Sequence, residues 1–422
     1  MNPDPSVSVN PVKHDSFSAL RITGFRNYIS GRFLLTVASL IQAVIVGWQV
    51  YELTKDPFSL GMIGLAEAIP AILIALIAGH IVDISSRKTV FLFAYSILLV
   101  CALLLVLVSS DISPFLHSNK LTSIYTIIFI SGIARGFTMP SAFAFMSQLV
   151  PKELFPNAVT WNASIWQLGA ILGPAVAGFV YSVFGFTLSY LVIAVLNILG
   201  IVFILTIEKK PVPETSRDGS LSRRLTAGLR FVFNDKIILS AISLDLFAVL
   251  FGGATALLPI FSAEILFTGP QGLGMLRAAP SIGAVLVALF LTRRPPVQDT
   301  GKKLLTCVFG FGICMIIFAV SKNFYLSVFI LALSGAFDAV SVVIRQTIIQ
   351  IMTPDNMKGR VSAVNSIFIG SSNEIGAFES GVAAKLMGVV PSVIFGGTMT
   401  LIVVFFVLLL SPKLRKLNLE PS

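Results

Sequence analysis

The stretch SGIARG, residues 131–136, recurs 203 positions further along the chain as SGAFDA, residues 334–339. A second segment, GLAEAIPA from Gly64, matches GMLRAAPS from Gly274 at a shift of 210 residues. Self-similarity at a fixed offset is the signature of an internal repeat. The sequence therefore predicts two homologous halves. At the shift of 203 the further matching pairs are Pro151 with Pro354, Asn162 with Asn365, Gly173 with Gly376, and Gly178 with Gly381.

Both copies lie in strongly apolar surroundings. The 422 residues are 55% hydrophobic and only 12% charged, against about 25% charged in soluble domains, and the mean hydropathy is +0.91. Because a membrane-spanning helix needs about 20 apolar residues, we predict an all-α membrane protein with twelve transmembrane helices in two six-helix, pseudo-symmetric halves. The apolar runs lie near 29–51, 60–82, 89–109, 122–148, 158–183, 187–207, 237–262, 271–292, 303–321, 323–350, 361–385 and 391–411.

The basic residues indicate an orientation. The net charge is +10, and most of the lysines and arginines lie in alternate short loops between the apolar runs. Cytoplasmic loops of membrane proteins carry such an excess, so a lipid bilayer explains the charge and no nucleic-acid partner is expected. Both termini then lie in the cytoplasm. The exceptions are Lys55, Lys120, Lys322 and Lys385 on the outer side and Arg135, Arg277 and Arg345 within spans.

A polar linker divides the halves. It contains EKKPVPETSRDGS followed by LSRRLTAGLRFVF, in which the apolar and the basic residues each recur at helical spacing. We expect this second part to lie along the inner membrane surface, with an ordinary solvated helix as the alternative. The predicted divisions are a cytoplasmic segment 1–28, a first bundle 29–207, the linker 208–236, a second bundle 237–411 and a cytoplasmic tail 412–422.

Charged residues within the spans are the candidates for function. Arg135 aligns with Asp338 at the shift of 203, and Glu67 aligns with Arg277 at the shift of 210. A charge at bilayer depth costs at least a few kcal/mol unless it faces water or a partner. We therefore expect a water-filled cavity between the halves, with static ion pairs that fix helix register as the alternative. The proton-coupling candidates are Asp245, Asp338, Arg135 and Glu67.

Polar residues on the same and neighbouring spans are candidates for binding cargo in this cavity. Glu374 and Glu379 are five residues apart on one span, so they point to different sides of the helix and at most one faces the cavity. The substrate-cavity candidates are Gln42, Arg345, Gln346, Asn162, Asn365 and Glu374.

Two motifs resemble signatures of the major facilitator superfamily. In GHIVDISSRK, residues 79–88, the matching positions are Gly79, Asp83, Arg87 and Lys88, whereas Ile84 and Ser86 depart from the signature. In GAILGPAVAG, residues 169–178, the matching positions are Gly169, Gly173, Pro174 and Gly178, and Ala177 replaces a glycine.

The first motif implies a latch that closes the cytoplasmic side, in which Asp83 meets a helix N-terminus of the other half and Arg87 pairs with acids. The second implies close helix packing and is associated with antiporters, and Arg135 resembles the arginine that the superfamily uses in proton coupling. The likeness over residues 20–410 is to the bacterial subfamily that includes the enterobactin exporter.

The sequence thus predicts a proton-coupled exporter of an amphiphilic small molecule, such as a drug or siderophore, that works by alternating access. An uncoupled facilitator or importer is a second hypothesis, and a receptor or scaffold that does not transport is a third. Catalysis, a cofactor and a metal site have no motif in their favour, and Cys101, Cys307 and Cys314 lie in apolar runs as small core residues. We expect a monomer in a bacterial inner membrane.

Overall fold

The structure is a computed structural model that describes residues 15–110, 118–211, 221–252, 254–291, 298–354 and 357–419. The remaining parts of the predicted segments 1–28, 208–236 and 412–422 lie outside these residues. Long aliphatic runs without a polar face form helices that bury their backbone hydrogen bonds, as a membrane requires. In the first half they are α1 (Thr23–Thr54), α2 (Pro57–Ile84), α3 (Arg87–Ser109), α5 (Lys120–Ser147) and α6 (Phe155–Leu205).

The second half begins after α7 (Leu221–Asn234), which packs on α13 and α8 rather than standing apart from the bundle. Asp235 caps α8 by accepting hydrogen bonds from the backbone amides of Ile237 and Ile238. The helices of this half are α8 (Lys236–Phe251), α10 (Gly269–Leu291), α11 (Thr300–Val320), α12 (Phe324–Met352), α13 (Lys358–Met387), α14 (Val389–Leu410) and α15 (Pro412–Arg415).

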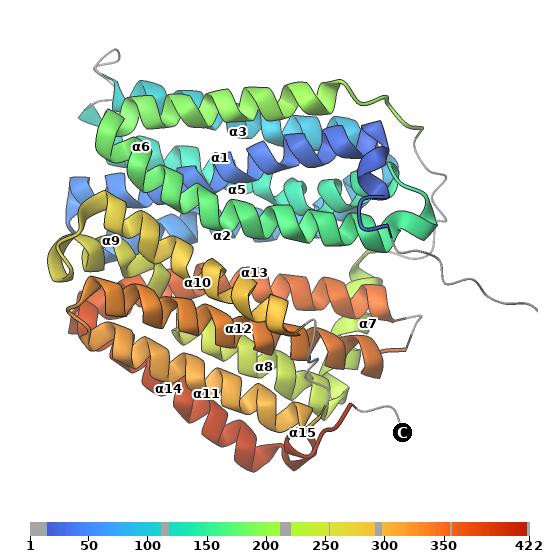
Figure 1. Ribbon diagram of the computed structural model, residues 1–422, viewed down its shortest axis with the longest axis vertical. Coiled ribbons are helices and arrows are strands. Elements are labelled where there is room, and N and C mark those ends of the chain that lie inside the picture. The colour runs from blue at the N-terminus through green and yellow to red at the C-terminus, as the bar shows by residue number, and fades with distance from the viewer. Residues whose placement is uncertain are drawn as a thin grey trace, which may run out of the picture.

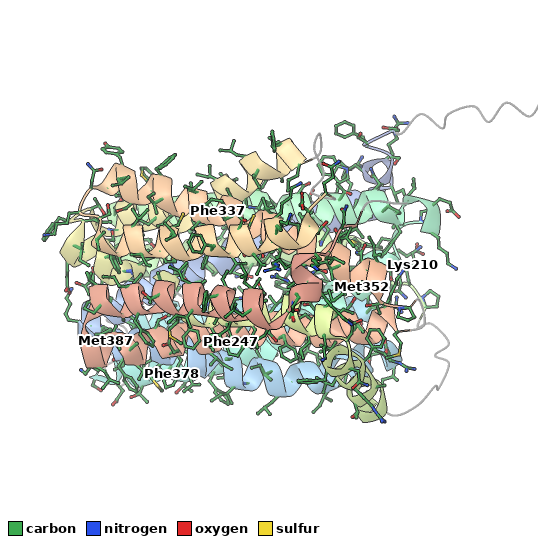
Figure 2. The ribbon with its side chains drawn as sticks, turned by 90° about the horizontal axis from the view of Figure 1, so that it is seen from below. Lys210, Phe247, Phe337, Met352, Phe378 and Met387 are labelled. Carbon is green, nitrogen blue, oxygen red and sulfur yellow. The ribbon has the colours of Figure 1, made fainter. Side chains whose placement is uncertain are left out.

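The two halves form separate bundles that lie one above the other in Figure 1, the first in blue to green and the second in yellow-green to red. Across the interface α2 packs against α13, and α6 packs against α10. Figure 2 places Lys210 and Met352 toward one end of the molecule and Met387 at the opposite end.

Ten helices in the described ranges are long and apolar enough to cross a membrane. The predicted fifth and sixth spans are both within α6, which doubles back at Gly185, a glycine with a φ of 71° (Figure 1). This left-handed conformation is open to glycine at no steric cost. The predicted eleventh span corresponds to α13, a 30-residue helix that is more polar than the ten.

The predicted seventh span, 237–262, is broken. Its helix α8 ends at Phe251, and the chain resumes as the short helical segments η3 (Ala254–Leu257), α9 (Leu258–Ile260) and η4 (Phe261–Ile265). Its repeat-equivalent α1 runs unbroken over 32 residues. The difference follows from Gly252 and Pro259, because glycine and proline are the residues that interrupt helices.

The repeat extends to the packing. A Cβ added at Gly132 of α5 would lie 2.4 Å from the carbonyl oxygen of Glu67 and 2.7 Å from the ring of Pro70. At the equivalent place in the second bundle, a Cβ on Gly335 would lie 2.0 Å from the carbonyl oxygen of Pro280. In each bundle a glycine thus lets the fourth span touch the backbone of the second span.

We expect Gly335→Ala to lower the free energy of unfolding by about 1–3 kcal/mol, because the added methyl forces α10 and α12 apart. The measurement is denaturation of the purified protein in mixed micelles. Gly370→Ala is the matched control, since a Cβ there meets nothing within 4 Å and alanine favours the helix. Equal stability of Gly335→Ala and the wild type would contradict the assigned contact.

The bundles meet mainly at one end of the molecule, which we call the closed end. There Lys385 Nζ lies 2.8 Å from Asp56 Oδ1, and the hydroxyl of Tyr51 donates to Glu264 Oε1 at 2.7 Å. At the opposite end, the terminal end, a Cβ added at Gly79 of α2 or Gly370 of α13 would meet nothing within 4 Å. The facing surfaces of the bundles are therefore apart at the terminal end.

Candidate functional site

A buried ion pair joins α8 to α12. Nη1 of Arg345 contacts Oδ1 of Asp245, and the two side chains are only 2% and 8% exposed. Nε of Arg345 is buried without a hydrogen-bond partner. Because a lone charge at this depth is very unfavourable, each residue offsets the cost of burying the charge of the other.

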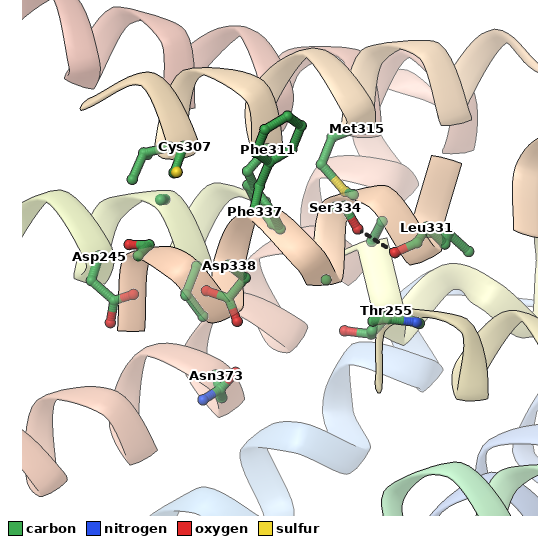
Figure 3. Close-up of a pocket in the computed structure, with 18 of the residues that line it drawn as sticks. Asp245, Thr255, Cys307, Phe311, Met315, Leu331, Ser334, Phe337, Asp338 and Asn373 are labelled. Atoms are coloured by element: carbon green, nitrogen blue, oxygen red, sulfur yellow. Dashed lines mark hydrogen bonds between the residues drawn. The ribbon is translucent and has the colours of Figure 1, made fainter. Parts of the chain in front are cut away.

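Beside this pair lies a cavity of about 200 Å³ within the second bundle. Figure 3 shows the carboxylates of Asp245 and Asp338 turned toward the same space, with the side chain of Asn373 beyond them. Asp338 has no direct hydrogen bond or ion pair in the described part of the chain, although Asp245 and Arg345 act on it electrostatically. Asp338 is thus the acidic group of the cavity without a fixed partner.

The rest of the cavity wall is mostly apolar, with a few hydroxyl and amide groups. Phe311 and Phe337 contribute aromatic rings, and Thr255 and Ser334 contribute hydroxyls (Figure 3). The break after α8 helps to form this wall, because Gly252 and Thr255 both line it. Discontinuous helices commonly form binding sites in transporters.

A second set of charges lies where the bundles meet. Nη1 of Arg135 on α5 is 2.7 Å from Oε1 of Glu67 on α2, and these side chains are 30% and 14% exposed. Glu374 on α13 interacts electrostatically with Glu67, Arg135 and Arg277. Arg277 on α10 donates from Nη2 to the carbonyl oxygen of Thr255 at 3.4 Å. We call Glu67, Arg135, Arg277 and Glu374 the interface quartet.

The repeat-equivalent residues Arg135 and Asp338 therefore belong to different groups of charges. Arg135 pairs with Glu67 of its own bundle, whereas Asp338 and Asp245 lie beside Arg345. The four proton-coupling candidates thus divide into two pairs at two places, rather than forming one central group.

The other candidate cargo residues belong to neither of these two groups. Gln42 is buried on α1, and Gln346 is half-buried on α12 next to Arg345. Oδ1 of Asn162 and Oδ1 of Asn365 are both buried and lack a hydrogen-bond partner. Gln42, Gln346, Asn162 and Asn365 are not among the residues that line the cavity.

The glycine motif of α6 packs in two directions. A Cβ on Gly169 would lie 2.9 Å from Cγ2 of Thr36, and one on Gly173 would lie 2.7 Å from Cβ of Leu40, both on α1. Further along, a Cβ on Gly178 would lie 3.2 Å from Cα of Gly274, and the carbonyl oxygen of Pro174 would lie 2.5 Å from a Cβ on Gly274. The motif therefore packs α6 within its bundle and also against the other bundle.

The motif at residues 79–88 has a different geometry from the one that the resemblance implies. In place of an acidic partner, Nη1 of Arg87 donates to the carbonyl oxygen of Ala144 and to Oγ of Ser147, each at 3.0 Å. Lys88 donates to the carbonyl oxygens of Leu205 and Ile207. These cations cap the C-terminal ends of α5 and α6, where the helix dipole favours positive charge.

Asp83 is exposed and makes no hydrogen bond or ion pair among the described residues. It therefore does not contact a helix N-terminus of the second bundle. The physical reason is the separation of the bundles at the terminal end, where a Cβ added at Gly79 would also meet no atom within 4 Å.

Several cavity residues were not predicted. Thr255, Phe311 and Asn373 line the cavity, but hydroxyl, aromatic and amide residues are common in helices and carry no signal individually. The glycine and proline near residues 252 and 259 were the available sign of a broken helix in this bundle. Within the described ranges no group of His, Cys, Asp and Glu side chains is arranged to hold a metal ion.

Comparison with known proteins agrees with this architecture. The profile of the transmembrane secretion effector family of the major facilitator superfamily matches residues 14–422. The enterobactin exporter EntS of Salmonella typhi is 23% identical over 397 residues, which cover 94% of both chains. The enterobactin exporter EntS of Escherichia coli O1:K1 / APEC is also 23% identical, with the same coverage.

Solved structures show the same fold at low sequence identity. A point mutant of the nucleoside transporter NupG superposes with a TM-score of 0.71 at 14% identity and covers 92% of this chain and 100% of its own. A bacterial homolog of the human lysosomal transporter Spinster, in an inward-facing and unoccupied conformation, gives a TM-score of 0.72 at 12% identity, covering 94% and 99%. This chain belongs to the transmembrane secretion effector family and is a multi-pass membrane transporter of the major facilitator superfamily, not an enzyme.

Proposed function

We propose that this transporter is a proton-coupled exporter of an amphiphilic small molecule. The observation that carries the proposal is the cavity of the second bundle, in which the unpaired carboxylate of Asp338 faces an otherwise largely apolar space. A carboxylate in such a place can hold either a proton or a positively charged or hydrogen-bond-donating group of the cargo. Competition between the two for one group couples their movements.

The chemistry of the wall supports a cargo with an apolar body and one polar group. Phe311 and Phe337 offer ring faces that can pack against a flat or aliphatic body. Asp245 is already neutralised by Arg345, so Asp338 provides the net negative charge of the cavity. An anion would meet this charge without compensation, whereas a cation or a hydrogen-bond donor would offset it.

The proposed orientation of the protein in the membrane is consistent with export. We place both termini in the cytoplasm, because basic residues dominate the terminal end, and we place the protein as a monomer in a bacterial inner membrane. The closed end then faces outward, and the described conformation receives cargo from the cytoplasm. The relatives named as exporters support transport from the cytoplasm outward.

Everted membrane vesicles test the proposal. Respiration acidifies their interior, so an exporter that exchanges cargo for protons accumulates ethidium or enterobactin inside. We expect Asp338→Asn to reduce this accumulation at least about tenfold, which corresponds to a loss of about 1.4 kcal/mol of coupling free energy. The measurement is protein-dependent accumulation with and without a protonophore.

Glu379→Gln is the matched control, because Glu379 is a half-buried carboxylate of α13 outside the cavity and outside the quartet. It should transport like the wild type. Accumulation that persists with the protonophore, or that is unchanged in Asp338→Asn, would contradict the proposal, and the first result would identify an uncoupled facilitator.

A further inference from the structure

Glu374 differs from the other members of the interface quartet. Glu67 and Arg135 form a direct pair at 2.7 Å, and Arg277 donates to a backbone carbonyl oxygen. Glu374 has no ion pair within 4.0 Å and no hydrogen bond among the described residues, although three charges act on it. One of these charges, Glu67, is a carboxylate on the opposite bundle.

The contact between the bundles covers one side of Glu374 in this conformation. A Cβ on Gly64 of α2 would lie 3.6 Å from Oε2 of Glu374, so the carboxylate lies against the backbone of the other bundle. Further toward the closed end, a Cβ on Gly381 would lie 2.7 Å from Cα of Gly61. Glu374 is therefore half-buried, with its carboxylate against the other bundle, while these helices touch.

We propose that closing the bundles at this end takes up one proton on Glu374, so that the interface between Glu67 and Glu374 is a second proton-binding point, separate from Asp338. When α2 and α13 separate, water solvates both carboxylates and each remains ionised. When they meet, the two carboxylates come within electrostatic range of each other in a partly buried place. A proton on Glu374 removes this repulsion and the cost of burying its charge.

The neighbouring cations do not remove the need for the proton. Arg135 on α5 is held by Glu67 in the same bundle. Arg277 on α10 reaches toward α1, where a Cβ on Gly47 would lie 3.6 Å from its Nη2, and it interacts with Glu374 only at longer range. The charged groups that face Glu374 from α2, α5 and α10 are thus Glu67, Arg135 and Arg277.

The sign of the pH dependence follows. The closed form binds the additional proton, so lowering the pH favours closure, by at most about tenfold in the closed-to-open ratio per pH unit for one proton.

The Asp56–Lys385 pair at the closed end does not cause this effect. Partial burial raises the pKa of Asp56, but hydrogen bonds from Lys385 and Ser59 outweigh it and hold the pKa below its ordinary value, so Asp56 stays ionised between about pH 5 and 8.

The experiment measures closure directly, without cargo. Spin labels at Leu53→Cys on α1 and Leu386→Cys on α13 report the distance across the closed end, since both positions are exposed, at 45% and 79%. The background replaces the three native cysteines by alanine, and the protein is in lipid nanodiscs. Between pH 8 and pH 5 we expect the short-distance population of the parent to rise at least about fivefold relative to the long-distance one.

Glu374→Gln should remain closed at every pH, because the amide carries no charge, and should lose the pH response. Glu379→Gln, on the same helix but outside the quartet, and Glu264→Gln, which removes another acid of the closed end, should keep it. A full pH response in Glu374→Gln, or its loss in either control, would overturn the proposal. Glu374→Asp keeps the carboxylate and should show the pH response of the parent protein. A folding defect at this position would instead abolish the response in Glu374→Asp as well as in Glu374→Gln.

The same labels separate this inference from the proposed function. Asp338→Asn should lose coupled export but still close at low pH, since its carboxylate lies in the cavity of the second bundle and not at the interface. A protein that closes with pH but shows no proton-driven export would reject the proposed function and keep this inference. Coupled export without pH-driven closure would do the reverse.

Discussion

Replacing Asp245 by asparagine should lower the free energy of unfolding by about 3–5 kcal/mol, because Arg345 then remains as a buried charge without its partner. The guanidinium side chain is 2% exposed and has no second acid in direct contact among the described residues. Removing one partner of a buried pair leaves the full desolvation cost of the other. The measurement is unfolding by sodium dodecyl sulphate in mixed micelles.

Two further variants test whether the loss of stability comes from the unpaired charge of Arg345. Asp245→Asn combined with Arg345→Met removes both charges, and it should recover most of the lost stability, because no buried charge is then left without a partner. Asp338→Asn removes a carboxylate without a direct partner and should cost less than about 1 kcal/mol. Equal losses in Asp245→Asn and Asp338→Asn would show that the ion pair does not stabilise the bundle.

Gly381→Val should prevent the closed end from forming. A Cβ at this position would lie 2.7 Å from Cα of Gly61 and 2.8 Å from the carbonyl oxygen of Pro57, and both neighbours are backbone atoms that cannot rotate away. Overpacking of this kind costs about 1–3 kcal/mol. The closed-to-open ratio should therefore fall by about 5- to 150-fold, and transport should fall with it.

The spin-label distance between residues 53 and 386 checks this expectation, together with vesicle transport. Gly370→Val is the control on the same helix, since a Cβ there meets no atom within 4 Å. Its distance distribution should match that of the parent protein. A short distance retained in Gly381→Val would mean that α2 and α13 do not have to touch at this point.

The helical architecture and the two halves could be predicted from the sequence, because both depend on information that a single chain carries. Apolar runs of sufficient length must be helical in a bilayer, and the match of SGIARG with SGAFDA marks the repeat. The same repeat explains the equivalent contacts of Gly132 and Gly335. The predicted gap between the fifth and sixth spans, residues 184–186, contains the turn at Gly185, although no polar loop marks it.

The pairing of the charges could not be predicted. Repeat-equivalent residues occupy equivalent places in two different bundles, so Arg135 and Asp338 align without being neighbours. What decides the partner of Arg135 is which face of α2 packs on α5, and Glu67 is on that face. A sequence position known to within a few residues does not fix a helix face, because one residue turns a side chain by about 100°.

All three cysteines are buried, and of these Cys307 lines the cavity, whereas Cys101 and Cys314 do not. The molecule therefore has a built-in chemical reporter at the place where cargo is proposed to reside. A membrane-permeant maleimide would alkylate this thiol more slowly when an occupant shields it, and the other two thiols would serve as an internal blank. Ligands can thus be sought by competition for alkylation before any flux has been detected.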